Sequence, residues 1–394
     1  MSIATAIQNA QTKVAAAYTS CDNKGATMPA AANQNLSNLA TTIDSIPTPI
    51  PLNKAIQLWV KTEEGGMVTY SREQVVGTTD YTAISDTQFQ NDTSLVSVML
   101  PDTVNHLGNN SFNGCTNLRY VNLENITVYG DRSLLNSGLT GELYLPKITR
   151  SAIGASTFQG TKITSIASLG ALTQLMGNPS VSCAPFGFCT ELESVTLPSS
   201  LTTLYCAFWG CTKLKTINLE NITTLRAWTF RECYNLHIDE LYMPNLTTIE
   251  DNAFGPGRGG NSFPYIYKIT SLGQITQIPD GNPGSGYGVF SQFTGLNEVT
   301  LHEGITKIGS CAFYKCTSLL SITLPSTVTT INQWALSDCY SMTTLTCLAT
   351  TPPTCNSPYF PNTLTAIYVP AASVSAYKSA SYWSSFASKI QAIP

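Results

Sequence analysis

The feature that most constrains this chain is a unit of about 22 to 24 residues that returns along most of its length. One copy runs from Phe313 through Cys316 and Leu319 to Ile322 and Leu324, and its pattern is A-F-x-x-C followed by L-x-x-[IV]-x-L. Apolar positions two residues apart predict a short strand that points alternate side chains inward. Further copies open at Phe89, Phe112, Phe186, Phe208, Phe230 and Phe290, and more degenerate ones at Leu134, Phe158, Phe254 and Phe360.

One such unit cannot fold alone. Its roughly five apolar side chains supply about 10 kcal/mol on burial, at ~2 kcal/mol each. Ordering some 22 residues costs more than this, at ~1 to 2 kcal/mol for each backbone residue. The units therefore have to stack on one another, which predicts a solenoid with short parallel strands on one face and turns and irregular segments on the other.

A longer period of about 100 residues overlies the short one. Residues 122–127 recur as 218–223 (NLENIT), and residues 142–146 (ELYLP) recur as 240–244 (ELYMP). A block of several units has therefore been duplicated. The two blocks differ chiefly in their loops, of which 255–261 and 280–288 are the richest in glycine. Loops that vary on a fixed scaffold often tune binding, although flexible insertions explain these two equally well.

The composition excludes several classes of partner. Charged residues make up 11% of the chain, its net charge is -4, and it has no run of Lys or Arg. We therefore expect it to bind neither nucleic acid nor anionic lipid. No stretch reaches the ~20 apolar residues of a membrane span, so we expect no membrane insertion. The first residues lack the basic start and apolar core of a signal peptide, so if the chain begins here at its natural start, export by the general secretory route is not expected.

The two ends differ from the repeats. Residues 1–46 carry Ile3, Ile7, Val14 and Tyr18 at spacings of three and four or their multiples, which predicts a small helical module for attachment or oligomerisation. Packing within the same chain explains this stripe equally well. We expect a linker and N-terminal cap with a small hairpin at 47–80, leucine-rich repeats at 81–347, and a last repeat and cap at 348–394. The last part is predicted to include an amphipathic helix from 374 to 390.

A family resemblance rests on the A-F-x-x-C and L-P elements. From about residue 84 to residue 370 the chain resembles the BspA-like leucine-rich repeats of bacterial surface proteins, and residues 349–355 (ATTPPTC) resemble part of the closing segment of that family. This resemblance implies a leucine-rich-repeat solenoid that serves adhesion or receptor contact and not catalysis. The opening segment, with ATAIQNAQ and NKGATMPA, is similar to N-terminal modules of phage tail and fibre proteins.

Twelve cysteines raise the question of disulfides or metal binding. We expect the six that share one position of the unit to form a buried ladder of small apolar groups. Since no C-x-x-C pair occurs, a zinc site is a remote alternative. A disulfide is another alternative, and Cys347 and Cys355 of the closing segment are the pair that would form it. The six are Cys115, Cys189, Cys211, Cys233, Cys316 and Cys339.

Catalytic patterns are missing from the sequence. His106, His237 and His302 stand in different units, and neither a phosphate-cradling glycine motif nor a nucleophile elbow occurs. Glu142 and Glu240, about four units apart, are expected roughly 20 Å apart at ~4.8 Å per strand, whereas a glycosidase pair needs about 5 to 9.5 Å. We predict no catalytic residue, no metal ligand and no cofactor, and hence a protein that is not an enzyme.

The strand face remains as the candidate binding surface. Residues that flank the central apolar position should project outward, where Tyr, Thr, Asn and Glu suit hydrogen bonding and stacking against a polysaccharide or a protein. A solvated face that serves only solubility is the alternative. The candidate ligand-binding residues are Tyr120, Asn122, Glu142, Tyr144, Thr216, Asn218, Glu240, Tyr242 and Glu298.

Our leading hypothesis is a virion protein, from a phage tail or fibre, that binds a host receptor. Its expected partners are a glycan or protein of the host-cell surface and other virion proteins, which it contacts through the N-terminal module; self-association into a homo-oligomer is a further expectation. The first alternative is a bacterial cell-surface adhesin with BspA-like repeats. The second is a purely structural virion protein, whose repeats only decorate or brace the particle.

Overall fold

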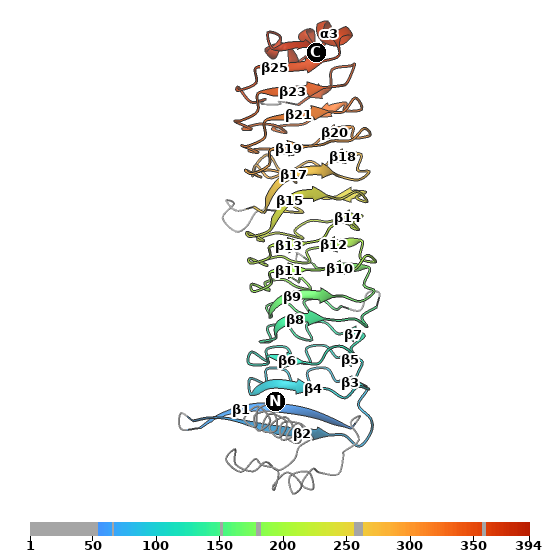
Figure 1. Cartoon of the computed structure of the whole chain (residues 1–394), viewed down its shortest axis with the longest axis vertical. Coiled ribbons are helices and arrows are strands. Elements are labelled where there is room, and N and C mark those ends of the chain that lie inside the picture. The colour runs from blue at the N-terminus through green and yellow to red at the C-terminus, as the bar shows by residue number, and fades with distance from the viewer. Residues whose placement is uncertain (1–53, 65–66, 150–152, 179–182, 256–262, 357–359) are drawn as a thin grey trace, which may run out of the picture.

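The computed structural model describes residues 54–64, 67–149, 153–178, 183–255, 263–356 and 360–394. Over these residues the chain winds into one elongated stack, in which each coil lies on the one before it (Figure 1). This is the parallel-strand solenoid that the repeat predicts. The expected helical module at 1–46, with Ile3, Ile7, Val14 and Tyr18, lies outside the described residues.

One side of the coils is formed by short strands, which we call the first column. Their central aliphatic residues are in register, so that Val195 pairs in parallel with Ile166 on one side and with Ile217 on the other. Val195 and Ile166 are buried, so this position points into the core. The column comprises β4 (Leu95–Met99), β6 (Tyr120–Val121), β8 (Thr140–Tyr144), β9 (Lys162–Ser168), β11 (Ser194–Val195), β13 (Thr216–Ile217), β15 (His237–Tyr242), β17 (Tyr265–Ser271), β19 (Glu298–Val299), β21 (Ser321–Leu324), β23 (Thr344–Cys347), β25 (Ala366–Val369) and β26 (Ile390–Ala392).

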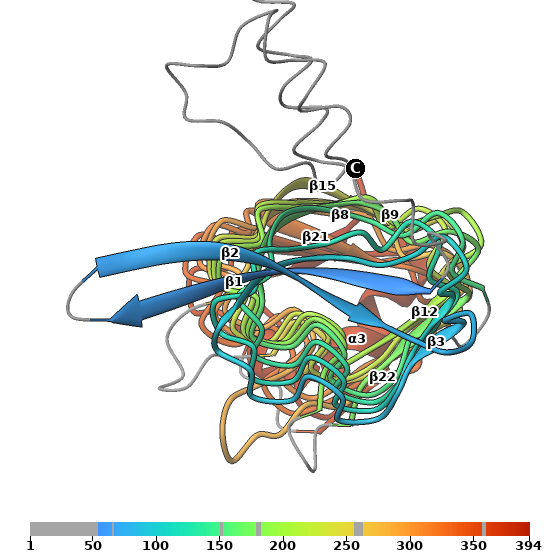
Figure 2. The same ribbon diagram turned by 90° about the horizontal axis from the view of Figure 1, so that it is seen from below.

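A second column of strands lines another side of the coils (Figure 2). The prediction of only turns and irregular segments away from the first column was therefore wrong. These strands are two or three residues long because the chain turns at both ends, and so short a segment leaves no alternation to read in the sequence. Threonine hydroxyls join them, since Thr329 Oγ1 donates to the carbonyl of Thr306 one coil earlier at 3.1 Å. The column comprises β3 (Ala83–Ile84), β5 (His106–Leu107), β7 (Val128–Tyr129), β10 (Gln174–Met176), β12 (Thr203–Tyr205), β14 (Thr224–Leu225), β16 (Thr248–Ile249), β18 (Gln277–Ile278), β20 (Lys307–Ile308), β22 (Thr330–Ile331) and β24 (Thr354–Cys355).

Stacked phenylalanines fill the corner of most coils, where the chain turns. The ring centroids of Phe186, Phe208 and Phe230 follow one another at 5.7 and 6.0 Å, with planes that differ by at most 10°. All three side chains are fully buried. Each ring stacks on rings of the coils directly above and below, so the core is a chain of nearest-neighbour contacts, as expected of a solenoid.

The six cysteines of the repeated position form a buried ladder beside these rings. Each thiol donates a hydrogen bond to a phenylalanine carbonyl of the preceding coil, as Cys233 does to Phe208 at 3.2 Å. The eleven cysteines in the described part of the chain are all buried, and none of them is in a disulfide. Cys347 and Cys355 therefore form no disulfide, and Cys347 Sγ accepts a hydrogen bond from the Tyr377 hydroxyl at 3.1 Å.

A hairpin covers the N-terminal end of the described stack. Its strands β1 (Ala55–Glu64) and β2 (Met67–Val76) are antiparallel, and β1 also pairs antiparallel with β4 of the first coil. Ile56, Leu58 and Val60 of β1 are buried against the core. The hairpin thus occupies a strand edge that would otherwise be open to another chain.

The C-terminal cap differs from the predicted helix over 374–390. It contains η3 (Ala371–Ser373), the short α3 (Val374–Ser379) and η4 (Trp383–Phe386), and it ends in β26, which pairs in parallel with β25. Tyr377 and Trp383 are both fully buried, and they donate to the carbonyls of Ala349 and Pro353 at 2.8 and 2.9 Å. In one continuous helix two residues six apart point about 120° apart, and the break in the helix lets both side chains face the core.

Candidate functional site on the strand face

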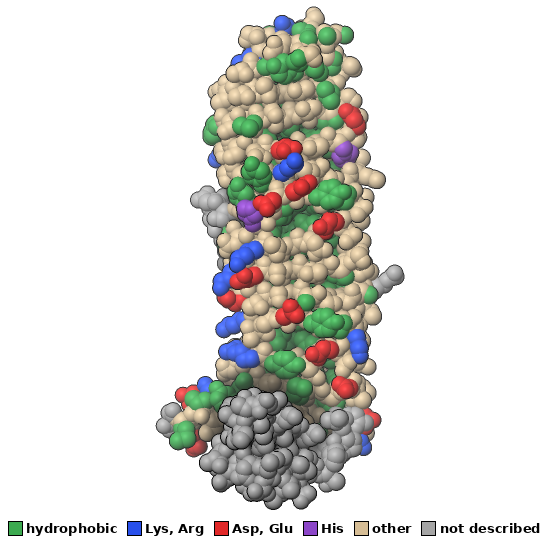
Figure 3. Space-filling model, in the orientation of Figure 1, with side chains coloured by type: hydrophobic (Ala, Val, Ile, Leu, Met, Phe, Trp, Pro, Cys, Tyr) green, Lys and Arg blue, Asp and Glu red, His purple; other side chains and the backbone are tan. Residues whose placement is uncertain are grey.

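The outward face of the first column carries a row of exposed tyrosines. Tyr120, Tyr144 and Tyr242 are 46%, 51% and 49% exposed, and each lies beside the buried aliphatic residue of its strand. On the space-filling surface the hydrophobic side chains form separate patches along this face, with acidic side chains beside them and several of the basic ones along the left edge (Figure 3). The strands hold these rings on backbone that is hydrogen-bonded to neighbouring coils.

The structure brings three of the predicted residues together around one cleft. Tyr120 of β6 and Glu142 and Tyr144 of β8 line a hollow of about 70 Å³, together with Glu124 and Thr140. Partial burial, followed by the negative charge of Glu124, raises the pKa of the Tyr120 hydroxyl, which therefore stays protonated and able to donate. Two aromatic rings and two carboxylates around a shallow hollow suit stacking and hydrogen bonding.

A second group lies further along the same face. Glu240 of β15, Lys268 of β17 and Glu298 of β19 are in register. Lys268 Nζ lies 3.0 Å from Glu298 Oε1, and Thr270 Oγ1 donates to Glu240 Oε1 at 2.6 Å. Both carboxylates are therefore partnered already, and exposed pairs of this kind add little to stability. They remain accessible as hydrogen-bond acceptors beside Tyr242.

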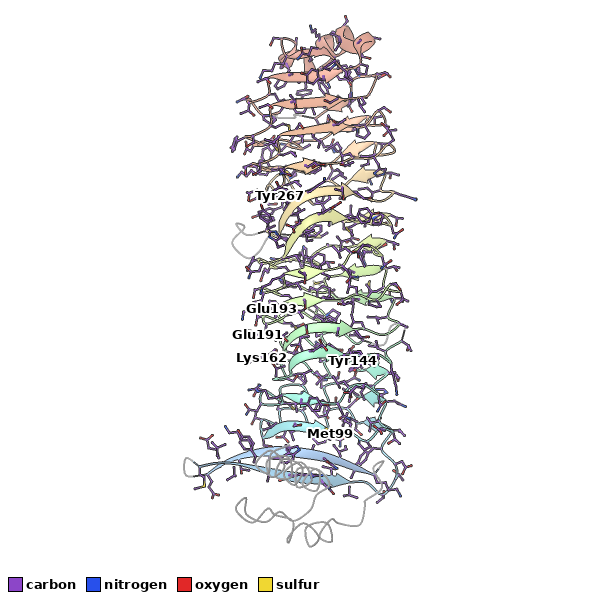
Figure 4. All side chains as sticks on the ribbon, in the orientation of Figure 1. Met99, Tyr144, Lys162, Glu191, Glu193 and Tyr267 are labelled. Atoms are coloured by element: carbon purple, nitrogen blue, oxygen red, sulfur yellow. The ribbon has the colours of Figure 1, made fainter. Side chains whose placement is uncertain are left out.

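Sequence reasoning missed the aromatic residues of β17. The rings of His237 and Tyr265 stack at 4.6 Å with planes 9° apart, and Tyr267 is 46% exposed. Figure 4 shows Tyr267 and Tyr144 on the same strand column, several coils apart. The signal was the alternation of Tyr265, Ile266 and Tyr267, which places both tyrosines on the outer side of a strand whose central residue is buried.

Two predicted binding residues, Asn122 and Asn218, form hydrogen bonds with backbone of the preceding coil. The amide of Asn122 donates to the carbonyl of Leu100 at 2.9 Å and accepts from the same residue's N–H at 2.6 Å. Asn218 makes the same pair of bonds to Leu197, at 3.1 and 2.7 Å. Since both amides are occupied by backbone of the preceding coil, we leave Asn122 and Asn218 out of the proposed binding surface.

Thr216 stays exposed, next to a ladder of ion pairs along one edge of the column. Lys213 Nζ lies 2.6 Å from Glu191 Oε2, and Lys215 Nζ lies 2.7 Å from Glu193 Oε2, each pair joining two consecutive coils. Figure 4 shows Glu191 and Glu193 at this edge, with Lys162 nearby. Hydrogen bonding to Lys215 lowers the pKa of Glu193, so that carboxylate is charged near neutral pH.

The described residues contain no cluster of three or more His, Cys, Asp or Glu side chains that could hold a metal ion. Within the same ranges, no helix is long and apolar enough to cross a bilayer. Glu142 and Glu240 belong to strands four coils apart, or roughly 20 Å at ~4.8 Å per strand. The face thus offers rings, hydroxyls and carboxylates for holding a partner.

Comparison with known proteins gives a family and several distant structures. The family described as BspA type Leucine rich repeat region (6 copies) matches residues 70–183, 172–274 and 259–385. A leucine-rich repeat protein from Bacteroides ovatus is 22% identical over 86% of this chain and 98% of its own, with a TM-score of 0.46. A leucine rich cell surface protein from Faecalibacterium prausnitzii is 16% identical over 85% of each chain, with a TM-score of 0.29. A search of curated proteins gave no match.

Proposed function

The chain belongs to the BspA-type leucine-rich-repeat family, and on that premise we propose that it is a non-enzymatic adhesin of the bacterial cell surface. It holds its partner on the outward face of the first column. The observation that carries this proposal is a row of half-exposed tyrosines on strands that pair in parallel with strands of neighbouring coils. These tyrosines are Tyr120, Tyr144 and Tyr242. A ring with few rotatable bonds on a rigid support loses little conformational entropy on binding.

The proposed partner is a glycan or a protein exposed on a host cell. Both offer flat apolar surfaces for the rings and hydroxyl or amide groups for Glu142, Glu240 and the neighbouring threonines. The face is long, with about a dozen strands at ~4.8 Å spacing, so it fits an extended ligand better than a small molecule. A partner that contacts both tyrosine groups gains from two sites on one scaffold.

Attachment to a phage particle is a weaker proposal. It rests on residues 1–46 alone, which lie outside the described residues and outside the matched ranges. The proposal of cell-surface attachment is supported by the family match of the repeats, which make up most of the chain. Antibody labelling of intact bacterial cells and of purified phage particles separates the two: label on cells supports the adhesin, whereas label confined to particles would replace it with the virion protein.

Cell binding by the purified full-length chain tests the adhesin. We expect the double variant Tyr144→Ala with Tyr242→Ala to bind host cells at least tenfold more weakly than the natural chain, because both rings lie on the proposed face. Tyr70→Ala is the control, since Tyr70 is an exposed tyrosine on the cap hairpin, away from the first column. Equal binding by all three proteins would rule out the strand face as the site.

A further inference from the structure

A larger cavity lies away from the strand face, where the last coils turn. It has a volume of about 490 Å³, and Tyr314, Trp334, Tyr340 and Phe360 line it together with Asp338, Asn362 and Thr363. The rings of Tyr314 and Trp334 stack at 5.9 Å with planes 27° apart, and Tyr340 is 62% exposed. The cavity therefore combines aromatic surface with an acid, an amide and a hydroxyl, as ligand sites commonly do.

The coils from Phe208 to Cys233 contain an internal counterpart of this cavity; we call them the first block, and the coils from Phe313 to Cys339 the later block. Trp209 follows Phe208 as Tyr314 follows Phe313, and Trp228 stands where Trp334 stands in the later block. Trp228 and Trp334 both have left-handed backbone, with φ of 60° and 59°. The cysteine ladder confirms the alignment, since Cys233 donates to the carbonyl of Phe208 and Cys339 to that of Phe313.

In the first block an arginine fills the space. The guanidinium carbon of Arg231 lies 5.0 Å from the ring centroid of Trp209 and 4.7 Å from that of Trp228. Trp209 is only 4% exposed beneath it. In the later block the residue aligned with Arg231 is Ser337, which lines the cavity. Replacing a long side chain with a hydroxymethyl group leaves the face of Trp334 open.

The positive charge is retained in the later block, but on another coil. Lys315 stands where the first block has Gly210, and its Nζ lies 5.1 Å from the ring centroid of Tyr314. The acid is also retained, as Glu232 in the first block and Asp338 in the later one. The negative charge of Asp338 raises the pKa of the Tyr340 hydroxyl, and the positive charge of Lys315 acts to lower it. Both charges therefore act at this wall of the cavity.

We propose that this cavity binds a neutral saccharide, with the apolar face of a sugar ring on Trp334 and its hydroxyls bonded to Asp338 and Asn362. A sugar ring has one face of C–H groups, which suits an open aromatic ring, and hydroxyls at its edge, which both donate and accept. Because Asp338 and Lys315 act in opposite directions on the Tyr340 hydroxyl, a charged ligand would gain little net attraction here. The site is separate from the strand face and does not depend on it.

Titration of the full-length chain with a panel of neutral gluco-, manno- and N-acetylglucosamine oligosaccharides tests this site. Isothermal titration calorimetry measures the affinity, and saturation-transfer NMR reports which sugar protons contact the protein. We expect at least one member of the panel to bind. In the variant Ser337→Arg its affinity falls at least tenfold, because the new guanidinium covers Trp334 as Arg231 covers Trp228. Ser199→Arg, at an exposed turn residue, is the matched control and should bind like the natural chain.

Trp334→Ala provides a second variant should Ser337→Arg fail to fold by circular dichroism, and it should also lose saccharide affinity. No binding by any oligosaccharide, or binding that both variants leave unchanged, would overturn the proposal. Binding of an arginine-containing peptide that Ser337→Arg abolishes, with no saccharide binding, would replace the sugar with a cationic side chain of a partner. Loss of cell binding in the Tyr144 and Tyr242 double variant concerns the strand face only, so the two proposals fail separately.

Discussion

The thiol of Cys339 donates a hydrogen bond to the backbone carbonyl of Phe313, 3.2 Å away in the preceding coil. Both residues are fully buried, so water cannot replace the bond. The same bond recurs along the stack, and it is made by Cys115, Cys189, Cys211, Cys233 and Cys316. This ladder joins coil to coil at the corner where the phenylalanine rings stack.

Replacing Cys339 with Ala removes one rung and leaves a small void. We expect the free energy of unfolding to fall by about 1 to 3 kcal/mol, from the lost hydrogen bond and the lost packing together. Urea denaturation followed by circular dichroism measures the change. Ser199→Ala, at an exposed turn residue, should change it by less than about 0.5 kcal/mol. Equal midpoints for both variants would show that the thiol does not hold the coils together.

The same ladder predicts sensitivity to alkaline pH. Burial raises the pKa of the Cys339 thiol from 9.0 to about 12. A group whose pKa is higher in the folded than in the unfolded chain contributes its full stability below the unfolded pKa and loses it as the pH rises toward the folded pKa. We therefore expect the urea midpoint to fall between pH 9 and pH 12, and to fall less steeply in Cys339→Ala. A midpoint independent of pH over that range would contradict the buried, protonated ladder.

Asn218 is predicted to stabilise the fold and to be dispensable for binding. Asn218→Ala leaves the N–H and carbonyl of Leu197 without their partner, which costs about 1 to 3 kcal/mol. Thr216→Ala, at an exposed position of the same strand segment, serves as the control for stability. Thermal unfolding and the cell-binding assay measure the two effects. Wild-type stability combined with weaker cell binding would return Asn218 to the binding surface.

Asp280 is predicted to make the stack sensitive to acid. Its Oδ1 accepts hydrogen bonds from the Ser310 N–H at 2.8 Å and from Asn332 Nδ2 at 2.6 Å, and its Oδ2 pairs with Lys307. Partial burial acts to raise the pKa of Asp280, but the bonds from Lys307, Asn332 and Ser310 outweigh it and lower that pKa to about 2. The carboxylate therefore stabilises the fold above pH ~4, and this contribution is lost as the pH falls toward 2.

Asp280→Asn tests this assignment, because it keeps the shape and removes the charge. We expect the variant to melt at a lower temperature than the natural chain at pH 7, and the difference to shrink as the pH falls to 2.5. Asp239→Asn is the control, since the Asp239 side chain is 88% exposed. A difference that stays constant from pH 7 to pH 2.5 would mean that the charge of Asp280 is not what joins these coils.

The first column and the core could be predicted from the sequence because they depend on positions that recur in every unit. Phe208 and Cys211 face the same surroundings as Phe313 and Cys316, so repetition alone identifies them as buried. The second column was missed because Thr330 and Ile331 make a strand too short to show a period. The predicted C-terminal helix was too long. Tyr377 and Trp383 are both apolar residue types, and the sequence does not show that the chain turns between them.

The candidate site could be predicted only in part. Tyr120, Tyr144 and Tyr242 were found because a residue beside a buried strand position must point outward. Asn122 and Asn218 occupy the same kind of position, and a polar residue there has the same sequence pattern whether it faces solvent or a neighbouring backbone. Their hydrogen bonds to Leu100 and Leu197 show that both amides face neighbouring backbone, and both partners lie in another coil.

By itself the sequence determined that this chain must be a stack of coils, since a unit with so few apolar residues gains enough burial only against its neighbours. Only the tertiary structure decided which polar groups are used between coils and which spaces stay open. Ser337 and Arg231 occupy equivalent positions, yet one lines a cavity and the other fills the corresponding space. The reason is that side chains from neighbouring coils, some 20 residues away along the chain, set the room available at each position.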